Sequence, residues 1–64
     1  MYKYRINFRD ERTVSLLKEL GEITWRSKVL NLLFFIPNKN ADLIIAQSLS
    51  GVLTIHPHYG GHKK

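Results

Sequence analysis

The stretch Leu32-Leu33-Phe34-Phe35-Ile36-Pro37 decides how this chain folds. Five apolar residues follow one another without a polar interruption, and a proline closes the run. A strand that is apolar on both faces is typical of the interior of a sheet whose two sides both meet other groups. Because side chains alternate along a strand, Leu33 and Phe35 must face the opposite side from the other three. The pattern leaves open which set faces the protein core.

The residues on either side of this run predict its neighbours. Residues 22–29 alternate between polar and apolar side chains, and Leu30-Asn31 offers a tight turn or bulge, so the two strands are expected to form a hairpin. After Pro37, Asn38-Lys39-Asn40 supplies capping residues for a helix over residues 41–49. The apolar stripe that we expect to face inward consists of Ala41, Ile44, Ile45 and Leu49.

The two ends of the chain add a strand each. Tyr2, Tyr4, Ile6 and Phe8 recur at period two, which predicts a first strand with one buried face. At the other end, Ser50-Gly51 ends the second helix, and a last strand is predicted from Val52 to Ile55 or His56. Pro57 is expected to end its pairing because proline has no backbone N–H.

A first helix is predicted between the first strand and the hairpin. Asp10 or Thr13 can accept backbone N–H groups at its start, and its apolar spacing continues over about three turns. Gly21 stands where a left-handed C-cap is usual. The residues at helical spacing are Val14, Leu17 and Leu20.

The order strand, helix, strand, strand, helix, strand predicts a ferredoxin-like α+β fold. Such a fold has a four-stranded antiparallel sheet with both helices on one face, so the other face stays open. Apolar residues of the central strand would form an exposed patch there, beside Trp25 or Thr24 and Val52 or Leu53, and such a patch usually meets a partner. We expect one domain over residues 1–56 and an extended carboxy-terminal arm over residues 57–64, because the last residues have no apolar stripe of their own.

Length and composition narrow the classes of protein further. A chain of 64 residues forms one marginally stable domain, and its 44% hydrophobic content is too high for a disordered chain. There is no cysteine, so no disulfide framework forms. The first residues lack the apolar run of a secretory signal, and no stretch approaches the ~20 apolar residues of a membrane helix, so the sequence as given predicts a soluble protein. The net charge of +5 favours an acidic partner or nucleic acid.

The sequence predicts neither an enzyme nor a cofactor site. Four of the five carboxylates lie in or beside the first helix, where they serve capping and solubility, and no serine stands in a nucleophile motif. His56, His58 and His62 have a spacing that a metal could use. No cysteine or carboxylate joins them, so a solvated tail is the favoured interpretation and no metal site is predicted.

Two other kinds of partner deserve weight. RNA-recognition modules share this element order and stack bases on sheet aromatics, here represented by Tyr2, Tyr4, Phe34 and Phe35. The third strand lacks the basic and glycine residues of their signature, so a single-stranded RNA or DNA binder is an alternative hypothesis and not the favoured one. A homodimer formed through the open face is a further alternative.

Several short motifs, in order along nearly the whole chain, resemble the propeptides of subtilisin-type serine proteases. Tyr4-Arg5-Ile6-Asn7-Phe8-Arg9 is similar to the family's first strand, and Leu20-Gly21-Glu22-Ile23 to the start of its second. Leu30-Asn31-Leu32-Leu33-Phe34 resembles its turn into an apolar third strand. Ser50-Gly51-Val52-Leu53-Thr54-Ile55 resembles its last strand.

The resemblance implies a protein that inhibits a subtilisin-like protease or helps one to fold. In that family the open sheet face packs on surface helices of the protease, and the carboxy-terminal arm lies in the substrate cleft as an added strand. By position, Lys64 or Lys63 would approach the primary specificity pocket, and Gly61 the pocket four residues back. The implied arm residues are Tyr59, Gly60, Gly61, His62, Lys63 and Lys64, and the implied sheet-face contacts are Leu33, Phe35, Leu53 and Ile55.

Overall fold

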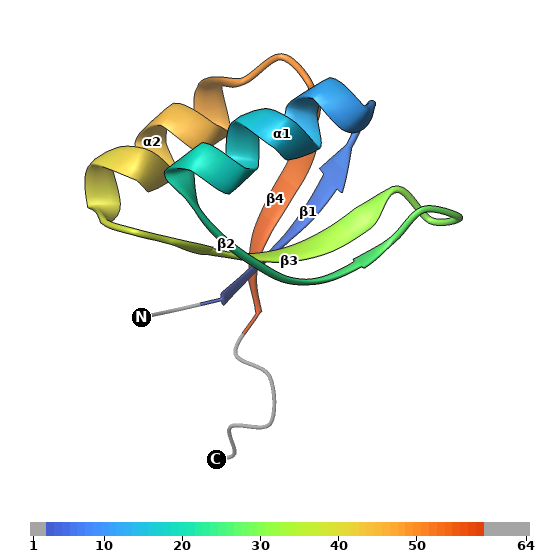
Figure 1. Cartoon of the computed structure of the whole chain (residues 1–64). Coiled ribbons are helices and arrows are strands. Elements are labelled where there is room, and N and C mark those ends of the chain that lie inside the picture. The colour runs from blue at the N-terminus through green and yellow to red at the C-terminus, as the bar shows by residue number, and fades with distance from the viewer. Residues whose placement is uncertain (1–2, 59–64) are drawn as a thin grey trace.

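The computed structural model describes residues 3–58. Within that range, four strands and two helices follow one another in the predicted order (Figure 1). The elements are β1 (Lys3–Phe8), α1 (Glu11–Leu20), β2 (Gly21–Ser27), β3 (Leu32–Pro37), α2 (Asn40–Ser48) and β4 (Val52–His58).

The four strands form one sheet in the order β2-β3-β1-β4, and every neighbouring pair is antiparallel. Figure 1 shows α1 and α2 side by side over one face of this sheet, while neither helix of the described residues covers the other face. The predicted ferredoxin-like α+β fold is therefore confirmed. β2 and β4 are the edge strands, and the apolar β3 lies inside the sheet beside β1.

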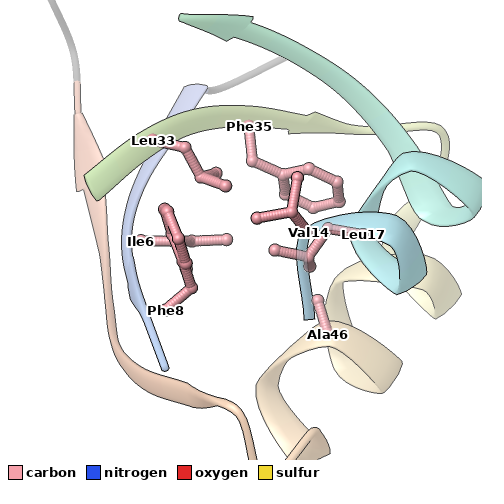
Figure 2. Close-up of a cluster of buried hydrophobic side chains, with 7 residues drawn as sticks. All are labelled: Ile6, Phe8, Val14, Leu17, Leu33, Phe35 and Ala46. Atoms are coloured by element: carbon pink, nitrogen blue, oxygen red, sulfur yellow. The ribbon is translucent and has the colours of Figure 1, made fainter. Parts of the chain in front are cut away.

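The core lies between the sheet and the helices. Ile6 and Phe8 of β1 share it with Leu33 and Phe35 of β3, because neighbours across an antiparallel pair point to the same face. The helices close it from the other side (Figure 2). The buried hydrophobic residues are Ile6, Phe8, Val14, Leu17, Leu33, Phe35 and Ala46.

α1 begins as the sequence predicts. Asp10 is the N-cap, and one carboxylate oxygen accepts from the backbone N–H of Thr13 at 3.1 Å and from its hydroxyl at 2.9 Å. Gly21 follows the helix, but its φ of 177° is extended, so the predicted left-handed cap is wrong. The glycine is needed for another reason. A Cβ at this position would collide with the carbonyl oxygen of Ile36 and lie 2.8 Å from Cα of Pro37.

The hairpin between β2 and β3 turns through Asn31, whose φ of 52° is left-handed, a conformation that asparagine tolerates well. Its carbonyl accepts from the backbone N–H of Phe8 at 3.0 Å, so the turn is attached to the end of β1. The turn lies where the sequence predicts it, but it takes the four residues 28–31, so β2 ends two residues earlier than expected. Val29, at its tip, is 93% exposed.

α2 faces the core with a different side from the one predicted. Ala46 is fully buried and Leu49, just after the helix, packs against the core, whereas Ile44 and Ile45 are 65% and 45% exposed and Ala41 is also exposed. The predicted stripe is therefore wrong except for Leu49. Apolar residues occur around much of this short helix, so its spacing alone does not identify the inward side, and the small Ala46 allows close packing against the core.

β4 is longer than predicted. Its pairing with β1 continues through Pro57 opposite Tyr4 to His58 opposite Lys3, so the expectation that Pro57 ends the pairing is wrong. An edge strand tolerates a proline where the missing N–H would face away from its neighbour, and β4 is such a strand. The expected boundary at residue 56 therefore falls inside β4.

Candidate functional site

The face of the sheet that no helix covers is the candidate site, and we call it the open face. Cross-strand pairing identifies its residues, because paired residues share a face. Phe34 pairs with Arg5 and Trp25, and Arg5 pairs in turn with His56. The open face comprises Lys3, Arg5 and Asn7 of β1, Glu22, Trp25 and Ser27 of β2, Leu32, Phe34 and Ile36 of β3, and Thr54, His56 and His58 of β4.

A bulge in β2 brings Trp25 to this face. Ile23 pairs with Phe35 and Trp25 with Phe34, so Thr24 is an extra residue between them. In a regular strand, residues two apart share a face, but the bulge sends Ile23 to the core and Trp25 to the open side. Trp25 is 46% exposed there.

Three rings form a row across the open face. The centroids of Trp25 and Phe34 lie 5.1 Å apart with the rings tilted by 37°. The ring of His58 stacks on Phe34 with centroids 4.6 Å apart and planes inclined by 11°. Trp25 comes from one edge strand and His58 from the other, so Phe34 lies between them, and the Nζ of Lys3 is 5.7 Å from its centroid.

The predicted sheet-face residues Leu33 and Phe35 lie on the wrong side for contact with a partner. Both are fully buried under the helices. Ile55 also faces that side, because it pairs with the buried Ile6 and packs against the core. Only Leu53 is exposed, in a second bulge where β4 has an extra residue opposite β1.

This outcome has a simple cause. The core positions Ile6 and Phe8 of β1 fix the side on which the helices lie, and Leu33 pairs directly with Ile6. The alternation within β3 separates its residues into two sets, but only this pairing says which set is inside. Phe34, its neighbour Trp25 and His58 are open-face residues that the expected list of sheet-face contacts omitted, although the sequence offered Trp25 as one of two alternatives and the alternation placed Phe34 in one of two sets.

Charged groups on the helix side are engaged in structural contacts. The guanidinium of Arg26 forms a bidentate ion pair with Glu11 of α1, in which Nη1 donates to Oε1 at 3.1 Å. The same guanidinium lies 5.5 Å from the ring centroid of Phe8. The hydrogen bond from Arg26 lowers the pKa of Glu11, and the same bond raises the pKa of Arg26. The backbone N–H and then the hydroxyl of Thr13 lower the pKa of Asp10. These carboxylates cap α1 and attach β2 to it.

The implied arm, from Tyr59 to Lys64, lies outside the described residues. So does His62, the third imidazole considered for a metal. His56 and His58 lie on the open face of β4, and over residues 3–58 there is no group of three or more histidine, cysteine or carboxylate side chains placed to hold a metal ion.

No protein-family model, curated protein or solved structure matches this chain. Within the described part of the chain, neither helix has the length and apolar character needed to cross a membrane.

Proposed function

We propose that this chain is a non-catalytic protein that binds a subtilisin-like serine protease and inhibits it or assists its folding. The observation that carries the proposal is the open face, where Trp25, Leu32, Phe34 and Ile36 form an apolar surface on β2 and β3 that no helix covers. Apolar surface of this kind is characteristic of protein-binding sites. The order of motifs that resembles subtilase propeptides names the class of partner.

The position of β4 supports the second part of the proposed mechanism. β4 is an edge strand, so one side of its backbone pairs with β1 and, among residues 3–58, the other side has no neighbouring strand. The chain continues from His58 into Tyr59–Lys64. We propose that these residues enter the substrate cleft as an added strand, held by main-chain hydrogen bonds, with Lys63 or Lys64 nearest to the primary specificity pocket.

The open face would supply affinity and the terminal segment would block catalysis. Fully burying a large apolar side chain is worth about 1.5–3 kcal/mol, and aromatic anchors contribute disproportionately to protein interfaces. Association and side-chain ordering together cost at least several kcal/mol. A few such anchors therefore leave a net affinity only if the partner surface is complementary to them.

Single-stranded nucleic acid is the second candidate, because Trp25, Phe34 and His58 lie beside Lys3 and Arg5. Stacking rings next to cations are the usual elements of such sites. Two features disfavour it. Phe35 is buried in the core, and Phe34 is flanked by Trp25 and His58, so a base could stack on Phe34 only after displacing one of them.

The experiment is an inhibition assay with purified chain and a panel of subtilisin-like proteases. We expect competitive inhibition of at least one protease, weakened by more than tenfold when Tyr59–Lys64 are deleted. The deletion leaves every described element intact, so circular dichroism should show an unchanged fold. Inhibition of no protease, or inhibition unchanged by the deletion, would reject the proposed mechanism.

A further inference from the structure

The open face is divided into two halves of different chemistry. The strands β2 and β3 present the apolar half, which is dominated by Trp25 and Phe34. The neighbouring strands β1 and β4 present a polar half in which Arg5 pairs with His56, and Lys3 with His58. Asn7 and Thr54 continue this half, joined by a 2.8 Å hydrogen bond between their side chains.

The polar half is cationic and has no carboxylate of its own. Neither β1 nor β4 contains aspartate or glutamate. Among residues 3–58, the ion pairs join Arg9 to Asp10 and Arg26 to Glu11, so no carboxylate there pairs with Lys3 or Arg5. The one acidic residue of the open face, Glu22, is on the opposite edge strand, where it pairs with Ile36.

From this division we infer that the open face fits a protease surface that is acidic beside an apolar patch. Carboxylates, or the carbonyl ends of helices, would meet Lys3 and Arg5 while an apolar area covers Trp25 and Phe34. The inference rests on the proposed function and specifies its partner. It also assigns a contact role to Lys3 and Arg5, whose side chains are held on one side of the sheet by the pairing of β1.

A second copy of this chain is a poor occupant of the same face. In a twofold dimer formed through the open faces, the polar half would meet either its own counterpart or the apolar half of the other copy. The first arrangement brings Lys3 and Arg5 toward like charges, and the second buries them against apolar groups without a carboxylate. Charge repulsion in the first arrangement and burial of unpaired charge in the second both make the free energy of dimer formation less favourable.

The test compares two double variants that remove the same charge. Lys3→Gln/Arg5→Gln neutralises the open face, and Arg12→Gln/Lys18→Gln neutralises two exposed positions of α1. Each is assayed in the full-length chain against the most strongly inhibited protease at low and high salt. We expect the open-face variant to bind about tenfold or more weakly at low salt and to lose most of its salt dependence, whereas the α1 variant changes by less than about threefold.

The outcomes separate the inference from the function. Inhibition that is equally strong in both double variants would overturn the inference and leave the proposed function standing. Inhibition of no protease by the unaltered chain would overturn both. A fluorescent single-stranded DNA bound more tightly than any protease, with affinity lost in Lys3→Gln/Arg5→Gln, would assign the cationic half to nucleic acid instead. Circular dichroism of each variant confirms that the fold is retained.

Discussion

Asp10 joins the loop after β1 to the first turn of α1 through two hydrogen bonds, both to Thr13. These bonds require an acceptor and favour the ionised carboxylate, so the pKa of Asp10 lies below its ordinary value of 3.8 in the folded chain. The unfolded chain lacks this preference. The stabilisation that results is therefore complete above about pH 4 and is lost as the pH falls through the lowered folded pKa.

We predict that Asp10→Asn makes the melting temperature of the chain less dependent on pH in the acid range. Asparagine keeps a side-chain oxygen that can cap α1 but does not titrate. We expect the melting temperature of the unaltered chain to fall more between pH 5 and pH 2 than that of Asp10→Asn, as measured by circular dichroism. Glu19→Gln, at an exposed position of the same helix, is the control and should follow the unaltered chain. Parallel curves for all three would contradict this account of the cap.

Position 21 requires glycine because β2 and β3 approach each other closely there, and not because the residue caps α1. An added Cβ would meet the backbone of Ile36 and Pro37, which cannot move without disturbing β3. We expect Gly21→Ala to lower the free energy of unfolding by about 1–3 kcal/mol, the usual range for overpacking. Urea denaturation measures this change. The neighbouring Glu22→Ala, at an exposed position, should cost less than about 0.5 kcal/mol.

α2 is the element whose inward side differs most from the side that its sequence predicts. The helix is present as predicted, but its N-cap is Lys39 and no side chain caps it, so the expected capping is wrong. Hydrophobicity alone places Ile44 and Ile45 inside and leaves Ala46 outside. Packing reverses that order, because the small side chain is the one that fits against the core. Hydrophobicity identifies candidates for burial, while the space between the elements selects among them.

The inward side of α2 can be tested directly. Ala46→Leu places three further carbon atoms in a filled core, so we expect a loss of about 1–3 kcal/mol in the free energy of unfolding. Ile44→Ala removes a side chain that is 65% exposed and should cost clearly less. Urea unfolding of the two variants gives the comparison. A larger loss for Ile44→Ala than for Ala46→Leu would restore the side predicted from the sequence.

The strands were more predictable than the site that they form. Alternation in β1 identifies Ile6 and Phe8 as core, and the apolar run of β3 identifies a strand inside the sheet. The residues of the open face, however, depend on the pairing register and on the bulge at Thr24. The register joins residues that are distant in sequence, and the bulge depends on a single unpaired residue. Neither leaves a periodic signal. Trp25 and Phe34 could be named from the sequence only as alternatives.

In the whole domain, one side of β3 builds the core, and the other side belongs to the open face that we propose binds a partner. Leu33 belongs to a core in which the described part of the chain buries seven hydrophobic residues, so Leu33→Ala should cost about 2–5 kcal/mol and leave much of this small domain unfolded. Phe34→Ala removes a partly exposed ring from the open face and should cost less. Urea denaturation distinguishes the two. Equal losses would mean that the open face is as important to folding as the core.

In the proposed function the open face, and not the helix layer, meets a protease. The most direct measurement is an NMR titration of the isotopically labelled chain with the subtilisin-like protease that it inhibits most strongly. The protease is used in a form whose active-site serine is replaced, so that it cannot cleave the chain. We expect the indole signal of Trp25 and the methyl signals of Leu32 and Ile36 to shift or broaden, while the methyl signals of Leu16 and Ile44 on the helices stay unchanged. Perturbation confined to the helix methyls, or no perturbation with any protease of the panel, would contradict it.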